Sequence, residues 1–354
     1  MFPIELKNWI PSNSFQDAIK QNCDDRHFVL PGLTNSHDHL EFNLFPKLRH
    51  RIYEDYVDWG NDIHSKDSTV IKKISTIPLL LRIQLGVLKN LLQGITTVVH
   101  HGVHHPLIKQ VPFRVFLDYH YVHSLRTDKW WRLKMLKAPF QKPILLHLAE
   151  GVSPQMHKEV DLLQRANLLN RPIIAIHGIG VEDEDQLKKL YALVWCPDSN
   201  FFLYGKTAPV EKFKRVPVLF GTDSNVSSSI SFWEQLRVAR ATKKLSDEAL
   251  FNAIAFLPKN IFKIKNEDDF VLVKRTKNNI WDSIYSIQEE DIDLVVCNHQ
   301  IVLADDSVVG KHANQLLPVI FKGRKKWLLP YWHEVVRQLE KLPIDLPFEL
   351  KSLP

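Results

Sequence analysis

Short apolar runs that end in polar residues recur along the first two thirds of the chain. They are Phe28–Phe42, Gly94–His101, Phe113–Leu125, Pro143–Gly151, Arg171–Gly178, Leu193–Asn200 and Val216–Ser224. Between them lie stretches with apolar residues at helical spacing, such as LLLRIQLGVLKNLLQ, MHKEVDLLQRANLL and EDEDQLKKLYAL. This alternation predicts an α/β fold in which helices cover a parallel sheet. A count of seven or eight strands favours a closed (β/α)8 barrel of the TIM type.

After Phe262 the pattern changes to short strands with polar turns and no helices between them: FVLVKR, DSIYSI, DLVVCN and QIVLAD. This predicts a small antiparallel β-domain, and WLLPYWHEVVRQLEKL near the end predicts one helix that packs on the body. We therefore expect a barrel over residues 28–262 and a small, reduced accessory β-domain formed by residues 1–27 and 263–324. Residues 325–354 are expected to form a helical tail.

Composition excludes several classes of protein. No run of 18 apolar residues indicates a transmembrane helix, and the N-terminus lacks the basic and apolar regions of a secretory signal. The three cysteines are far apart and include no C-x-x-C pair, which fits a reducing cytoplasm. The net charge is +6, but no basic stripe interleaved with aromatics indicates nucleic-acid binding. We expect a cytoplasmic protein with a small-molecule substrate, and the sequence leaves open whether it forms a homo-oligomer.

Five metal-binding side chains fall at the ends of predicted strands: His37, His39, His147, His177 and Asp223. The carboxyl ends of parallel strands meet on one face of a barrel, where active sites are built. Any one of these histidines alone is better explained as a satisfied core residue. Packing in the core is a poor explanation for five such residues that all lie at strand ends. We therefore expect the five side chains to form one site.

The spacing and residue types indicate a metal site. Side chains two apart on a strand share a face, so His37 and His39 can present two imidazoles to one cation. His147 adds a third nitrogen and Asp223 a carboxylate, a set that suits zinc first among the transition metals. Glu150, three residues after His147, could move a proton from a metal-activated water to a leaving group. The alternative is a solvated loop glutamate.

Other motifs narrow the interpretation. The sequence contains no H-E-x-x-H, P-loop, G-x-S-x-G, G-x-G-x-x-G or cytidine-deaminase signature. The dense cluster HHGVHH (residues 100–105) could form a second metal site. We expect instead that one or two of its histidines face the pocket while the others lie on a loop. His177 could be a metal ligand, or could hydrogen-bond the attacking water or a carbonyl oxygen.

These motifs together resemble the amidohydrolase superfamily, in particular the single-metal aminohydrolase branch that contains atrazine chlorohydrolase and guanine deaminase. The resemblance covers roughly residues 29–262. It is carried, in the family's order, by PGLTNSHDHL, GITTVV, ILLHLAEG, IIAIHGIGV, WCPDSN and LFGTDS. It implies that His37, His39, His147 and Asp223 bind one metal ion, zinc with iron as the alternative.

The resemblance also implies the remaining roles. Glu150 would be the proton shuttle, His177 would polarise the substrate or position the nucleophile, and Asp223 would help to orient or deprotonate the water. Ser199 and Asn200 would lie near the substrate. The lysine or glutamate that bridges two metals in other branches is missing from FLDYHYVHSL, which favours one ion.

Two departures from the family concern the accessory regions. Only 36 residues precede His37, so we expect an accessory β-domain that is mainly C-terminal. The stretch between the third and fifth strands is short, which puts the family's usual substrate loops in doubt. Phe42 and Trp59 could bind a planar ring at the pocket mouth or could belong to the core.

The sequence thus predicts a metal-dependent hydrolase, and first a hydrolytic deaminase of an aminated heterocycle that uses a zinc-activated water. The same residues could hydrolyse an amide, a lactam or a C–Cl bond. A relative that binds a ligand without turning it over is the alternative from another class.

Overall fold

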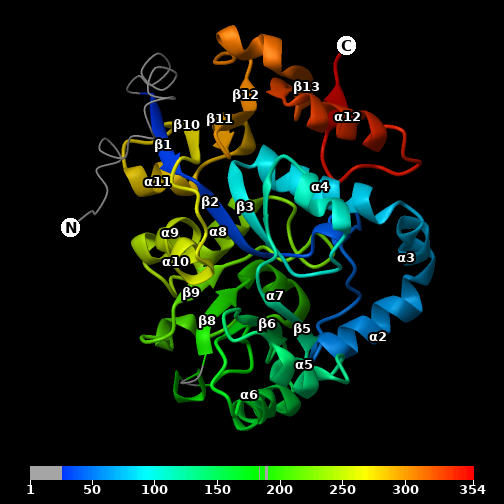
Figure 1. The fold of residues 1–354 in the computed structure, drawn as a ribbon, viewed down its shortest axis with the longest axis vertical. Helices are drawn as coiled ribbons and strands as arrows, with labels where there is room; N and C mark the ends of the chain where they lie inside the picture. Colours follow the sequence, from blue (N-terminus) through cyan, green and yellow to red (C-terminus); the bar gives the residue numbers. More distant parts are fainter. Residues whose placement is uncertain (1–25, 183, 188–189) are drawn as a thin grey trace.

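The structure is a computed structural model that describes residues 26–182, 184–187 and 190–354 (Figure 1). Eight strands pair in parallel within two sheets. The three-stranded sheet contains β2 (Leu33–Asp38), β3 (Ile95–His100) and β4 (Arg114–Phe116). The five-stranded sheet contains β5 (His120–Ser124), β6 (Ile144–Leu148), β7 (Ile173–His177), β8 (Leu190–Trp195) and β9 (Val218–Phe220). The fold is therefore α/β.

Strands β6 (ILLHL) and β7 (IIAIH) form because nearly all their side chains are apolar on both faces. All five residues of β6 and of β7 are buried, as parallel strands covered by helices require. The register pairs Leu148 with His177, so the polar ends of the two strands lie at the same edge. At the end of β9, the N–H groups of Thr222 and Asp223 donate to the carbonyl of His37 on β2, at 3.0 and 3.1 Å. The chain thus brings its first and last parallel strands together.

Helices follow or separate the parallel strands. They are α2 (Tyr56–Lys66), α3 (Ser68–Ser75), α4 (Leu79–Leu92), α5 (Trp131–Lys137), α6 (Pro154–Ala166), α7 (Pro197–Tyr204), α8 (Phe232–Ala241), α9 (Asp247–Ala255) and α10 (Leu257–Phe262). Helix α4 packs especially closely on the segment that follows β2, because a Cβ atom on Gly86 would lie 2.3 Å from the Leu40 carbonyl oxygen. This contact fixes the backbone beside His39.

An antiparallel sheet of seven strands lies at one end of the molecule, at the top of Figure 1. Its order is β1 (His27–Pro31), β10 (Phe270–Lys274), β11 (Ile292–Cys297), β12 (Gln300–Asp305), β14 (Arg324–Leu328), β13 (Leu317–Phe321) and β15 (Leu350–Ser352). Helix α12 (Pro330–Leu339) packs against this sheet and against α4. Apolar residues of the sheet belong to the same buried cluster as the helices around the parallel strands.

The structure differs from the predicted elements in several places. Residues 28–31, expected in the barrel, form β1 of the antiparallel sheet. The tail expected to be helical also supplies β14 and β15. Helix α11 (Ile280–Tyr285) interrupts a region expected to lack helices. In EDEDQLKKLYAL the predicted helix is replaced, among the described residues, by a 3-10 turn over Glu184–Leu187 and by β8.

The segment predicted as one strand over residues 193–200 is part strand and part helix. β8 ends at Trp195, and α7 begins at Pro197. Proline fits the first turn of a helix because its missing N–H has no partner to lose there, and Asp198 favours the same helix end. None of the helices in the described part of the chain has the length and apolar character needed to span a membrane.

Candidate metal centre and active site

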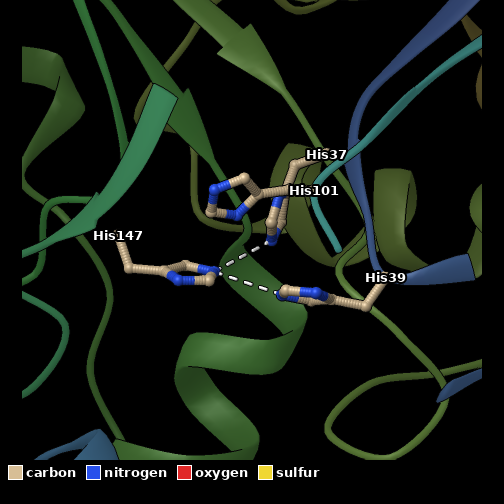
Figure 2. A group of neighbouring side chains, drawn as sticks. All are labelled: His37, His39, His101 and His147. Carbon is tan, nitrogen blue, oxygen red and sulfur yellow. Dashed lines mark hydrogen bonds between the residues drawn. The ribbon is translucent and has the colours of Figure 1, made fainter. Parts of the chain in front are cut away.

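Three imidazoles converge where the parallel strands end. His37 lies on β2, His39 immediately follows β2, and His147 lies on β6. The Nε2 atom of His147 is 3.2 Å from Nε2 of His39 and 3.4 Å from Nε2 of His37 (Figure 2). The Oδ1 atom of Asp223 is 3.8 Å from Nε2 of both His37 and His39. The structure therefore brings together the predicted ligand set from three distant parts of the sequence.

This arrangement fits a metal ion. Zinc–nitrogen bonds of 2.0–2.1 Å in a tetrahedral site place two ligand nitrogens about 3.3 Å apart. The separations of 3.2 and 3.4 Å match that spacing. The Nδ1 atom of His147 lies 3.1 Å from the carbonyl oxygen of His123, which can only accept. His147 therefore carries its proton on Nδ1 and directs the lone pair of Nε2 into the site.

Burial keeps the imidazoles of His37 and His147 in the form that binds metals. Desolvation, followed by the neighbouring imidazoles, lowers the pKa of His37 and His147 well below the usual histidine value. Neutral imidazole offers a nitrogen lone pair, whereas imidazolium does not. His37 and His147 are thus prepared for metal binding at neutral pH.

Asp223 is held by hydroxyl and amide donors. Its Oδ2 atom accepts hydrogen bonds from the hydroxyls of Ser199 and Ser227, both at 2.7 Å, and its Oδ1 atom accepts from the N–H of Ser224 at 2.8 Å. The backbone of Asp223 has a φ of +58°, in the left-handed region that non-glycine residues seldom adopt. Such a conformation persists where its surroundings enforce it, commonly at functional sites.

Glu150 lies beside this cluster on the loop after β6. Its Oε2 atom is 3.6 Å from Nε2 of His177, and its Oε1 atom accepts a 2.7 Å hydrogen bond from the hydroxyl of Tyr204. Burial raises the pKa of Glu150, while His177 and Tyr204 act in the opposite direction. The carboxyl group is only 5% exposed, so it is not a solvated loop residue. A buried carboxyl with a raised pKa can hold a proton near neutral pH.

His177 ends β7 and also has a left-handed backbone, with a φ of +73°. Its Nδ1 atom is 2.8 Å from Oδ1 of Asn200. The amide nitrogen of Asn200 donates to the hydroxyl of Thr207, which identifies Oδ1 as the acceptor. Nδ1 of His177 is therefore the donor, and its Nε2 atom faces Glu150.

The four residues expected near the substrate occupy different positions. Ser199 and Asn200 are fully buried on α7, where they bond Asp223 and His177. Phe42 is 37% exposed, and its ring centre lies 5.6 Å from that of His39. Trp59 is half-buried, packs in the apolar cluster that contains Tyr204, and donates from its indole nitrogen to the carbonyl of Leu48. Phe42 alone of the four combines exposure with direct contact to a predicted ligand.

A hollow of about 630 Å³ opens beside the cluster. Its lining includes His123, whose ring centre is 4.9 Å from that of His147, together with Tyr121 and Trp130. The hollow is open to solvent rather than enclosed, and the rings of Tyr121, His123 and Trp130 give it an aromatic surface that suits a planar ligand.

A buried polar network lies next to the H-x-H pair. The Oδ2 atom of Asp38, between the two histidines in sequence, lies 2.8 Å from Nζ of Lys89 on α4. Asn43 and Asn90 donate to the same carboxylate at 2.8 and 2.9 Å. Asp38 and Lys89 are both buried. This network ties the backbone of the H-x-H pair to α4.

Several of these partners escape prediction from the sequence. Lys89 lies in an amphipathic helix, where a lysine normally faces water. Tyr204 is 54 residues from Glu150, and no local pattern connects them. His101, within HHGVHH, joins the imidazole cluster, and only the density of histidines in that segment draws attention to it.

Curated relatives and solved structures indicate which proteins the chain is similar to. No family model matches the chain. Curated proteins similar to it are named 5-methylthioadenosine/S-adenosylhomocysteine deaminases. The one from Dictyoglomus turgidum is 28% identical over 41% of this chain, the one from Caldicellulosiruptor saccharolyticus 30% over 37%, and the one from Pyrococcus furiosus 24% over 57%. The chain covers 41%, 34% and 56% of the lengths of these relatives.

Solved structures share the fold. A zinc-bound adenosine deaminase from Xanthomonas campestris aligns with a TM-score of 0.61 at 16% identity, over 79% of this chain and 81% of that structure. Guanine deaminase from Escherichia coli aligns with a TM-score of 0.56 at 15% identity, over 81% of this chain and 88% of that structure. These findings confirm the resemblance to the amidohydrolase superfamily. The chain is similar to deaminases of that superfamily in both sequence and fold.

Proposed function

We propose that the protein is a metal-dependent hydrolytic deaminase that acts on an aminated heterocycle. One observation carries the proposal: three imidazole nitrogens and a carboxylate oxygen converge at metal-ligand spacing, directly beside a buried carboxyl and a fourth imidazole. A metal centre with an adjacent proton carrier is the requirement for hydrolytic release of ammonia.

His37, His39, His147 and Asp223 would hold the ion, and we propose one zinc ion. Nitrogen-rich sites with one carboxylate suit zinc, and a zinc-bound adenosine deaminase shares the fold. When bound, zinc would lower the pKa of a water molecule to about 7 and so supply a nucleophile at neutral pH. The serine hydroxyls on Oδ2 of Asp223 leave Oδ1 to face His37 and His39.

Glu150 would carry the proton. Its Oε1 atom is occupied by the hydroxyl of Tyr204, so Oε2 is the atom free to exchange protons with the reacting groups. Oε2 would accept the proton released by the water and donate it to the ring nitrogen as hydroxide adds to the ring carbon. It would then take the proton of the new hydroxyl group and give it to the amino group, which leaves as ammonia while that carbon becomes a carbonyl. Burial raises the pKa of Glu150, which favours its protonated form more than in an exposed glutamate.

His177 would orient the reacting groups. Asn200 fixes its Nδ1 atom as a donor, which leaves Nε2 to face Glu150. We therefore propose that Ser199 and Asn200 act on the substrate indirectly, because they hold Asp223 and His177 in place. Phe42 and the aromatic hollow beside His147 would contact the planar ring.

An adenine-containing nucleoside is the substrate class we propose first. Its support is the name shared by the similar curated proteins, which refers to the deamination of such compounds. We also propose that the parallel strands close into a (β/α)8 barrel over residues 33–262. The hydrogen bonds from Thr222 and Asp223 to His37 support closure. Residues 27–31 and 263–354 would form the accessory domain. Two buried free thiols, Cys196 and Cys297, support a reducing, cytoplasmic location.

The test is an ammonia-release assay of the zinc-loaded chain over aminated purine nucleosides, purines, pyrimidines, pterins and triazines. We expect turnover of at least one adenine nucleoside. We expect a loss of roughly 100-fold or more in kcat for Glu150→Gln, because general acid–base catalysis contributes about 10²–10⁴-fold. Glu182→Gln, on an exposed glutamate outside the site, is the matched control. If the zinc-loaded chain releases ammonia from none of these compounds, hydrolysis of an amide, a lactam or a C–Cl bond becomes the better proposal. If the chain does not bind zinc, the result supports a relative that binds a ligand without catalysis.

A further inference from the structure

A fourth imidazole lies in the metal centre and is not used by the proposed mechanism. His101 follows β3 and is fully buried. One of its ring nitrogens lies within 4.8 Å of a ring nitrogen of each of His37, His39 and His147. Figure 2 shows its ring beside His37 and turned toward His147. We propose that His101 is a fifth protein ligand of the metal ion, bound through Nδ1; the inference rests on the proposed metal site.

The hydrogen bonding of His101 prepares this nitrogen for a metal. Its Nε2 atom lies 3.3 Å from the carbonyl oxygen of Val122, which can only accept a hydrogen bond. The proton of the neutral ring therefore sits on Nε2, and Nδ1 carries the lone pair. Nδ1 is buried and has no hydrogen-bond partner among the described residues. A buried polar atom without a partner costs about 1–3 kcal/mol, and a metal ion would satisfy it.

The distances allow one ion to use all four imidazoles. Two nitrogens on opposite sides of a zinc ion are about 4.2 Å apart, twice the zinc–nitrogen bond length. For one imidazole opposite His101, a separation of up to 4.8 Å requires a shift of about half an ångström. The imidazoles at a right angle to it must come to about 3.0 Å, so the ring of His101 has to move toward the ion on binding. Since Oδ1 of Asp223 lies 3.8 Å from two of the same nitrogens, it can complete a set of five protein donors. The water of the proposed reaction would then take a sixth position on the ion.

The other histidines of the segment HHGVHH (residues 100–105) do not lie in the imidazole cluster as His101 does. His100 is buried, but its Nε2 atom contacts the carbonyl of Val103 and its Nδ1 atom faces Glu41 at 3.8 Å. His104 is exposed, and its Nε2 atom lies 3.5 Å from the hydroxyl of Tyr119. Only His101 of this segment joins the described group of metal-binding side chains. The contrast supplies a matched control.

The experiment compares zinc binding by the full chain, by His101→Gln and by His104→Gln. The glutamine amide at position 101 can still donate to Val122, but it places no nitrogen lone pair where Nδ1 lies. Competition with a chelator measures the zinc Kd. We expect a rise of more than about 100-fold for His101→Gln, because loss of even an outer-shell partner costs about 10–100-fold. The Kd of His104→Gln should be unchanged, and thermal unfolding of the metal-free proteins checks that each variant folds.

X-ray absorption of the zinc-loaded wild-type chain gives an answer that needs no variant. We expect four imidazole ligands, and three in His101→Gln. Three imidazoles in the wild type, or an unchanged Kd in His101→Gln, would overturn the role of His101 and leave the proposed function intact. Two zinc ions per wild-type chain would also overturn it, because His101 would then belong to a second site. A wild-type chain that binds no zinc would contradict the proposed function itself.

Discussion

Replacement of Lys89 by methionine tests the buried network that ties the H-x-H pair to α4. The ammonium of Lys89 is 1% exposed and lies 2.8 Å from the carboxylate of Asp38, which is fully buried. Methionine fills a similar volume but leaves the carboxylate without a counter-ion. Breaking a buried ion pair on one side costs about 3–5 kcal/mol of unfolding free energy. Asp38 keeps hydrogen bonds from Asn43 and Asn90, so we expect the lower end, about 3 kcal/mol.

Urea denaturation of the metal-free protein at neutral pH measures this loss directly. Lys66→Met is the matched control, since Lys66 pairs with Asp62 at 2.9 Å but its side chain is 50% exposed. Exposed pairs contribute little, so the control should lose no more than about 1 kcal/mol. In the combined Asp38→Asn and Lys89→Met variant no unpaired charge remains buried, so part of the lost unfolding free energy should be recovered. We expect a coupling energy of about 2 kcal/mol between the two substitutions. A loss below about 1 kcal/mol in Lys89→Met would refute the reasoning.

Two further predictions concern protonation. Tyr204→Phe removes a hydrogen bond that lowers the pKa of Glu150, so this pKa should rise. The acidic limb of the pH–kcat profile should therefore move to higher pH. If the limb does not move, ionisation of Glu150 does not determine its position. Burial raises the pKa of Asp305, but the ammonium of Lys326 at 2.8 Å outweighs this and holds it at about 2. The folded pKa is thus lower than the unfolded value. Urea unfolding should therefore show about 2 kcal/mol more stability lost between pH 4 and pH 2 in the wild type than in Asp305→Asn. Equal losses in the two proteins would contradict the ion pair.

The convergence of the site could be predicted because it follows from sheet geometry. His147 and His177 end neighbouring parallel strands, and the carboxyl ends of such strands meet at one edge. Apolar runs mark these strands clearly in the sequence. The positions of His37 and Asp223 follow from the same rule, since the segment after β9 bonds to β2.

The boundaries of helices and strands were harder to predict where the same sequence feature is typical of two kinds of structure. The run over residues 193–200 contains a proline, which is typical both of a loop and of the first turn of a helix. The structure uses it to begin α7, and this places Ser199 and Asn200 behind the site. The tail shows the same problem, because WLL before Pro330 continues the helical apolar pattern but pairs in the sheet as β14.

Backbone conformation at the site also lies beyond pattern analysis. His177 and Asp223 adopt positive φ values that non-glycine residues seldom adopt, and no glycine marks the positions. The side-chain directions that result depend on surrounding contacts far apart in sequence, such as Ser199 with Asp223. A search of the sequence can name the two residues, but it cannot say which atoms face the metal.

The H-x-H pair shows how the two kinds of information combine. Strand alternation predicts that His37 and His39 share a face, yet β2 ends at Asp38 and His39 leaves it with φ −95° and ψ 86°. The alternation of side chains along a strand therefore does not determine the direction of the His39 imidazole. Asp38, which alternation directs away from the site, is instead anchored to Lys89 on α4. Asp38 is held by Lys89 on the side of the strand that faces α4, so the imidazoles of His37 and His39 are held on the opposite side. Loss of Lys89 should therefore weaken zinc binding as well as lower the stability of the fold.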